Sequence, residues 1–266
     1  QPKVLEILMP SNVRIIPRLD IKGPNLIKGI HLEGLRKIGN PNSYAKKYYN
    51  DGADEIIYMD VVASLYGRNN LQDVVKSTVK DVFVPITVGG GISTTDDVKR
   101  LLRSGAEKIS INTAAVKNPE LISKISKKFG SQCVVVSIEA KRISSLKWEI
   151  LIENGREKTN IDALEWAKKV ESLNAGEILL TSIDQEGTGK GFDYDLVKQI
   201  STNVNIPVIA CGGMKNSQDA KKVINESCAD AIAVSRILHY DISTIRNIRE
   251  DLKASNINVR DYEKTS

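Results

Sequence analysis

The segment that decides the fold is "VVVSIEAKR", residues 134–142. Its first five residues are apolar except for Ser137, and a carboxylate follows at Glu139 with no turn signal between them. A short, continuous apolar run rich in valine predicts a strand that is buried on both faces, as in a parallel sheet. An acid at the end of such a strand needs a partner or a task, because a buried charge is costly.

Segments of this kind recur along the chain, and amphipathic stretches separate them. This alternation predicts a parallel sheet covered by helices. Eight such units in about 250 residues have the size of a (β/α)₈ (TIM) barrel. An open doubly wound sheet is the alternative, but the chain has no GxGxxG motif to support it. The predicted strands are 13–21, 54–62, 84–90, 108–113, 133–140, 176–183, 206–213 and 230–237, and predicted helices include 40–52, 94–105, 118–130 and 162–174.

The two halves of the chain resemble each other. "GADEIIYMDV" corresponds to "NAGEILLTSI", and "VPITVGGGIST" corresponds to "IPVIACGGMKN". Glu55 and Glu177 are 122 residues apart, and so are Gly90 and Gly212. A repeat this long predicts two half-barrels of four βα units rather than a solenoid. We therefore expect one α/β barrel domain at 13–260, with an N-terminal extension at 1–12 and a C-terminal tail at 261–266.

Two carboxylates occupy equivalent places in the repeat. Asp20 and Glu139 are 119 residues apart, at the ends of the first and fifth predicted strands, which lie opposite each other in an eight-stranded barrel. The C-terminal face of such barrels carries the chemistry. Two carboxylates on rigid strand ends are suited to act as general acid and general base. In the alternative, each only pairs with a neighbouring lysine, Lys22 or Lys141.

Glycine-rich turns follow the third and seventh predicted strands. These are "VGGGIST", residues 88–94, and "CGGMKNS", residues 211–217. Glycine lets the backbone approach a phosphate, and a helix N-terminus offers free N–H groups. Two such turns at equivalent positions predict two anion sites and a substrate with two phosphates. In the alternative, the glycines only permit tight turns.

Four charged residues stand at the starts of strands 1, 2, 4 and 6. They are Arg14, Glu55, Lys108 and Glu177. In a barrel these charges would ring the floor as paired salt bridges and could gate a passage through it. The alternative is four separate charges in solvent at the strand entries.

Composition excludes several classes of function. The chain has 266 residues, a net charge of +5 and 5% aromatic residues. Its basic residues are dispersed, which argues against nucleic-acid binding and favours small anions. Three cysteines without a CxxC motif and only two histidines predict no metal site and no covalent nucleophile. The cysteine usage and the absence of a long apolar run predict a cytoplasmic protein without a membrane segment.

Taken together, the motifs resemble the cyclase subunit of imidazole glycerol phosphate synthase, an enzyme of histidine biosynthesis. The resemblance covers about residues 13–260 and rests on "RIIPRLD", "TVGGGI", "GAEKISINTAAVKNPELI" and "GTGKGFD". It implies a barrel that docks a glutaminase subunit on its N-terminal face and passes ammonia to the other face. There ammonia would react with a bisphosphorylated ribulosyl-aminoimidazole carboxamide nucleotide (PRFAR). The products would be imidazole glycerol phosphate and aminoimidazole carboxamide ribotide (AICAR), and no cofactor or metal is implied.

The resemblance also implies roles for individual residues. Asp20 matches a catalytic aspartate, and Lys28 matches a lysine that holds substrate. The first phosphate set is Gly91, Asn112 and Thr113, and the second phosphate set is Glu186, Gly187, Gly213, Ser235 and Arg236. The ammonia gate would consist of Arg14, Glu55, Lys108 and Glu177.

The chain departs from the family pattern at several of these positions. Glu139 stands where the family has its second catalytic aspartate, Arg236 where a serine is usual, and Arg18 where a cysteine is usual. Two alternative functions follow from these departures. The first is a diverged paralogue that delivers ammonia for sugar amidation in surface-polysaccharide biosynthesis. The second is a non-catalytic activator of the glutaminase.

Overall fold

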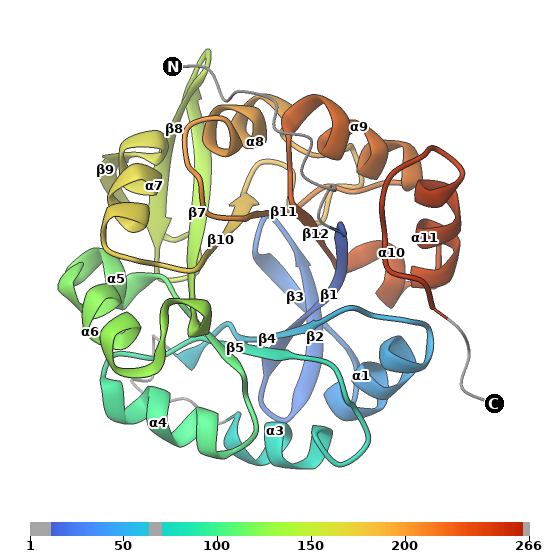
Figure 1. Cartoon of the computed structure of the whole chain (residues 1–266), viewed down its shortest axis with the longest axis horizontal. Helices are drawn as coiled ribbons and strands as arrows, with labels where there is room; N and C mark the ends of the chain where they lie inside the picture. The colour runs from blue at the N-terminus through green and yellow to red at the C-terminus, as the bar shows by residue number, and fades with distance from the viewer. Residues whose placement is uncertain (1–11, 64–70, 263–266) are drawn as a thin grey trace.

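A computed structural model describes residues 12–63 and 71–262 of the chain. Eight parallel strands form a closed barrel, because β7 pairs with β10 and β12 pairs with β1 (Figure 1). The predicted (β/α)₈ barrel is therefore confirmed. Its strands are β1 (Arg14–Lys22), β4 (Ile56–Asp60), β5 (Ile86–Gly89), β6 (Lys108–Ile111), β7 (Val134–Ser144), β10 (Glu177–Ser182), β11 (Val208–Cys211) and β12 (Ala231–Val234). Of the predicted terminal segments, residues 1–11 and 263–266 lie outside the described residues.

Helices surround the barrel and cover its outer face (Figure 1). Two of them begin with the same capping box, Thr94 with Asp97 and Asn216 with Asp219, each just after a glycine-rich turn. The helices are α1 (Pro41–Asn50), α3 (Gln72–Thr78), α4 (Thr95–Arg103), α5 (Thr113–Lys117), α6 (Glu120–Phe129), α7 (Ala163–Ser172), α8 (Tyr194–Ser201), α9 (Ser217–Ser227), α10 (Arg236–His239) and α11 (Ile245–Lys253), with a 3₁₀ turn at η1 (Ser131–Cys133). Within the two described ranges, no helix has the length and apolar character needed to cross a membrane.

Two antiparallel hairpins extend the barrel beyond its predicted strands. The first, β2 (Asn25–Ile30) with β3 (Glu33–Gly39), follows β1, and the second, β8 (Lys147–Ile152) with β9 (Glu157–Asp162), follows β7. They occupy equivalent positions in the two halves of the chain. The sequence predicted that Asp20 and Glu139 end their strands, but both strands continue past them into the hairpins. Each lies where pairing within the barrel passes into pairing with a hairpin.

The interior of the barrel is layered because alternate residues of each strand point inward. Along β1 the inward residues are Arg14, Ile16, Arg18 and Asp20. Ile16 belongs to a buried apolar layer above the charged floor, together with Ile57, Val135, Leu179, Ile209 and Ala231. The larger core lies between the strands and the surrounding helices. The apolar layer thus separates a charged floor from a charged mouth.

Candidate active site

The four charged residues at the strand starts form a closed ring, here called the floor ring. Arg14 Nη1 lies 2.5 Å from Glu55 Oε1 and 2.9 Å from Glu177 Oε1. Lys108 Nζ lies 2.9 Å from Glu55 Oε1 and 3.2 Å from Glu177 Oε1. Each cation thus contacts both acids, so the four are not separate charges in solvent. Burial lowers the pKa of Arg14, but the two glutamates outweigh burial and raise it.

Asp20 lies in the mouth of the barrel, 5% exposed, and is held by two cations. Arg18 Nε donates to Asp20 Oδ1 over 2.9 Å, and Lys28 Nζ lies 3.8 Å from Oδ2. Burial raises the pKa of Asp20, but the charges of Arg18 and Lys28 outweigh burial and leave this pKa below its usual value. Asp20 is therefore ionised at neutral pH. The partners of Asp20 are thus Arg18 and Lys28 rather than Lys22, the neighbouring lysine considered in the sequence analysis.

Glu139 is equally buried but less well partnered. Its Oε2 atom has no hydrogen-bond partner within the described residues. Burial raises the pKa of Glu139 to about 7, against the opposing charge of Arg18 and a hydrogen bond from the Gly155 backbone. Glu139 can therefore hold a proton near neutral pH and release it. Two titratable groups whose environments separate their pKa values are the mark of an acid and base pair.

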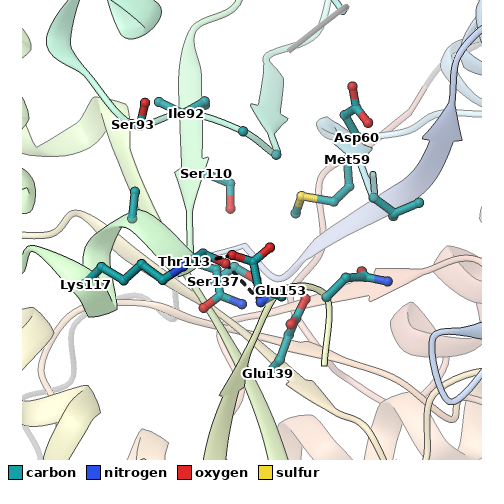
Figure 2. Close-up of a pocket in the computed structure, with 16 residues that line it drawn as sticks. Met59, Asp60, Ile92, Ser93, Ser110, Thr113, Lys117, Ser137, Glu139 and Glu153 are labelled. Atoms are coloured by element: carbon teal, nitrogen blue, oxygen red, sulfur yellow. Dashed lines mark hydrogen bonds and ion pairs between the residues drawn. The ribbon is translucent and has the colours of Figure 1, made fainter. Parts of the chain in front are cut away.

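A cavity opens beside Glu139 at the C-terminal ends of β4, β5, β6 and β7. The whole first phosphate set lines it: Gly91, Asn112 and Thr113. Figure 2 shows the labelled side chains around this cavity, with Glu139 on the side opposite Ile92 and Ser93. Gly90 has a φ of 96°, and a Cβ there would lie 2.1 Å from the Asp60 carbonyl oxygen. The turn thus needs glycine to fold as it does.

The rim of this cavity carries residues that the sequence analysis missed. Lys117, one helical turn after Thr113 in α5, lines the cavity and lies 3.1 Å from Glu153. Thr113 Oγ1 accepts a hydrogen bond from the Glu153 backbone over 3.0 Å. The β8–β9 turn therefore reaches over the first phosphate set. The spacing of four residues between Thr113 and Lys117 could have predicted that Lys117 lies beside the first phosphate set. The position of Glu153 could not be predicted, because it depends on the β8–β9 hairpin, which the sequence did not indicate.

The second phosphate set also lies together, around a much smaller cavity. Glu186, Gly187, Gly213, Ser235 and Arg236 line a space of about 10 Å³. The guanidinium of Arg236 packs against Gly189, where a Cβ would be 2.6 Å from Nη1. Ser235 Oγ donates to the Arg18 carbonyl over 2.9 Å, and Glu186 forms an ion pair with Lys28. The Arg236 carbonyl accepts a hydrogen bond from the Tyr240 backbone, whereas its guanidinium forms no hydrogen bond or ion pair with any residue that the structure describes.

The cysteines and histidines of the described residues do not gather into a metal site. Across residues 12–63 and 71–262, no group of three histidine, cysteine or acidic side chains is placed to hold a metal ion. His31 Nδ1 contacts the Ile183 carbonyl at 2.8 Å, and His239 Nδ1 contacts Tyr48 Oη at 2.5 Å. All three cysteines are free thiols.

A closed (β/α)₈ barrel with repeated halves and two buried carboxylates at its mouth defines a barrel enzyme. Residues 14–244 match the family model described as "Histidine biosynthesis protein". Several curated relatives carry the name imidazole glycerol phosphate synthase subunit HisF. The relative from Legionella pneumophila is 68% identical over 204 residues, covering 77% of this chain and 96% of its own length. Relatives from Bacillus cereus (strain G9842) and Methanococcus maripaludis are 45% and 46% identical, each covering 93% of this chain and 98% of their own length. The chain belongs to this family of synthase subunits.

Proposed function

We propose that this chain is the cyclase subunit of imidazole glycerol phosphate synthase. It combines PRFAR with ammonia and releases imidazole glycerol phosphate and AICAR, a step of histidine biosynthesis. The observation that carries this proposal is the pair of buried carboxylates, Asp20 and Glu139, at the mouth of a barrel whose relatives bear this name over nearly their whole length. A cytoplasmic location is part of the same proposal.

The different surroundings of the two carboxylates suit the chemistry. The ribulosyl group of PRFAR carries a ketone, so ammonia must add to a carbonyl and water must leave. Both steps move protons, and a positioned acid and base accelerate them. Asp20, ionised beside Arg18, is the group suited to accept a proton. Glu139, with a pKa near 7, is the group suited to donate one.

The two phosphate sets suit the two ends of PRFAR. The first set offers glycine backbone and the side chains of Asn112 and Thr113, with Lys117 at the rim. In the second set, Glu186 forms an ion pair with Lys28, and its carboxylate offers no hydrogen-bond donor to a phosphate. Arg236 has no anionic partner among the described residues, and a guanidinium binds phosphate through two parallel hydrogen bonds. Arg236 is therefore the phosphate ligand of this set, and together with Lys28 and Gly187 it also lines a larger cavity of about 540 Å³.

The ammonia supply belongs to the opposite face. The word "subunit" in the relatives' names implies a larger complex, and a glutaminase bound to the N-terminal face would deliver ammonia at the floor ring. Phe83, which lies just before β5 on that face, is 74% exposed and offers an apolar contact. The floor ring would then control entry into the barrel.

The two other functions considered for the sequence are not favoured. Relatives that cover 93% of the chain carry the synthase name, and none of those compared is named for sugar amidation or for glutaminase activation alone. The buried and differently charged carboxylates also fit a working active site better than a scaffold.

The test of Asp20 is turnover of PRFAR with an ammonium salt by the Asp20→Asn variant. We expect a loss of about 100-fold or more, the usual contribution of a general base. Asp81→Asn is the matched control, because Asp81 is an exposed acid that pairs with Lys46 on the outer surface. Full activity of Asp20→Asn would remove Asp20 from the mechanism.

A further inference from the structure

Arg18 is a buried cation in the middle of the barrel. It is the third inward residue of β1, between the apolar layer and Asp20, and its exposed fraction is 0%. It belongs neither to the floor ring nor to a phosphate set. Burying an arginine in this way costs desolvation free energy, which an anionic partner must offset.

The contacts of Arg18 fix its guanidinium across the barrel interior. Nε donates to Asp20 Oδ1 over 2.9 Å, and Nη1 donates to Thr181 Oγ1 over 3.0 Å. Nη1 also lies 3.6 Å from Cys211 Sγ. Thr181 and Cys211 belong to β10 and β11, so three strands hold the guanidinium in place. This geometry presents the Nε–H to Asp20 in one orientation.

The charge of Arg18 reaches both carboxylates of the proposed acid and base pair. After burial, it is the strongest influence on Asp20 and also on Glu139, and it lowers the pKa of each. The other groups that face Asp20 are Glu139 on β7, Lys28 on β2 and His239 on α10, and Lys28 is shared with Glu186. Those that face Glu139 are Asp20, the Asn112 side chain and the Gly155 backbone.

We propose that Arg18 is a positioning residue for this pair. Its guanidinium holds the carboxylate of Asp20 ionised and in one orientation, and its charge keeps Glu139 able to release its proton near neutral pH. The catalytic use of the pair rests on the proposed function. The positioning itself is a property of the free protein and can be measured without any substrate.

A role in packing alone gives a different result. If Arg18 only filled space, methionine would replace it with little change in the two titrations. If it acts through its charge, Arg18→Met must move both titrations to higher pH, because each carboxylate loses the cation that favours its ionised form.

The experiment is a pH titration by ¹³C NMR of the full chain with labelled Asp and Glu carboxyl groups. Asp20→Asn and Glu139→Gln assign the two signals. In Arg18→Met we expect both carboxyls to titrate at higher pH than in the natural protein. Arg142→Met is the control, because Arg142 pairs with Asp193 and Asp195 away from the barrel interior, and both titrations should stay unchanged. Unchanged titrations in folded Arg18→Met would overturn the proposal.

A second variant decides the question if Arg18→Met does not fold. Arg18→Lys keeps the charge but cannot reproduce the Nε contact with Asp20. We expect its kcat with PRFAR and ammonium to fall by about 10- to 100-fold with little change in the KM for PRFAR, as for a small misplacement of a catalytic group. An unchanged kcat would overturn the proposal. If the natural protein itself does not turn over PRFAR, the proposed function fails, and the role of Arg18 is decided by the Asp20 and Glu139 titrations in folded Arg18→Gln, which removes the charge and keeps a polar side chain: unshifted titrations overturn it.

Discussion

At the scale of single residues, Glu139 and Asp20 differ in their partners rather than in their burial. Arg18 and Lys28 stabilise the charge of Asp20, whereas one oxygen of Glu139 has no hydrogen-bond partner within the described residues. Glu139 is also one methylene longer than an aspartate, and it lines the same cavity as the first phosphate set. Because its pKa lies near 7, the stability of the folded protein should depend on pH in this range.

Glu139→Gln should change how stability depends on pH. Burial raises the pKa of Glu139 from 4.5 to about 7, so the folded protein keeps a proton that the unfolded chain releases. The proton on Glu139 stabilises the folded protein fully below pH 4.5. This stabilisation is lost as pH rises through about 7, which lowers the free energy of unfolding by about 3 kcal/mol. Urea unfolding at about pH 5 and about pH 8 should therefore show a smaller loss of unfolding free energy in Glu139→Gln. An equal loss of unfolding free energy in the natural protein and in Glu139→Gln would contradict the raised pKa of Glu139.

At the scale of elements, the eight barrel strands and the repeat could be predicted because their signals can be read directly from the sequence. Apolar runs mark the strands, and the offset of 122 residues marks the halves. The two hairpins could not be predicted in this way. β3 is mostly exposed and lacks an apolar run, and the β2–β3 turn uses His31 and Leu32 at positive φ instead of an Asn-Gly or Gly-Gly pair.

The same contrast holds for the candidate site. Asp20 and Glu139 lie where the barrel part of their strands ends, and the phosphate sets follow strand ends, so the barrel topology alone brings them to one face. The contacts of Arg18 could not be foreseen, because Thr181 and Cys211 are separated from it by 163 and 193 residues. Only the closed barrel brings these side chains together. The small size of the second cavity likewise depends on where the Arg236 side chain packs.

Gly213→Ala tests the turn that carries the second phosphate set. Gly213 has a φ of 97°, and a Cβ there would lie 2.0 Å from the Gly191 carbonyl oxygen. The turn must therefore move, at a cost of about 2 kcal/mol or more in unfolding free energy, and the KM for PRFAR should rise. Gly23→Ala is the control, since a Cβ at Gly23 meets no atom within 4 Å. Equal stability and KM for both variants would contradict a structural need for glycine at this turn.

At the scale of the whole molecule, the barrel places two charged regions at opposite ends of an apolar interior. The floor ring closes one end with four salt bridges, and the carboxylate pair lies at the other. In the proposed function, this arrangement separates the entry of ammonia from its use. Ammonia made by a glutaminase on the N-terminal face would have to pass the floor ring, whereas ammonia from solution could reach the mouth directly.

Lys108→Met should therefore separate the two sources of ammonia. It removes one of the two cations of the floor ring and leaves Glu55 and Glu177 with Arg14 alone. We expect turnover with glutamine and the glutaminase to fall about tenfold, which corresponds to about 1.4 kcal/mol, while turnover with ammonium salt stays unchanged. Lys46→Met is the control, because Lys46 forms an exposed pair with Asp81. Equal loss with both sources would contradict a gating role.

The central claim is that this barrel is a working cyclase, and the most direct measurement is turnover of PRFAR with an ammonium salt by the purified protein. The loss of PRFAR and the appearance of imidazole glycerol phosphate and AICAR would be followed together, beside Glu139→Asp. We predict that the natural protein forms both products in equal amounts, which would make Glu139 a working catalytic acid. The absence of product from the natural protein would contradict the account, most clearly if Glu139→Asp formed it.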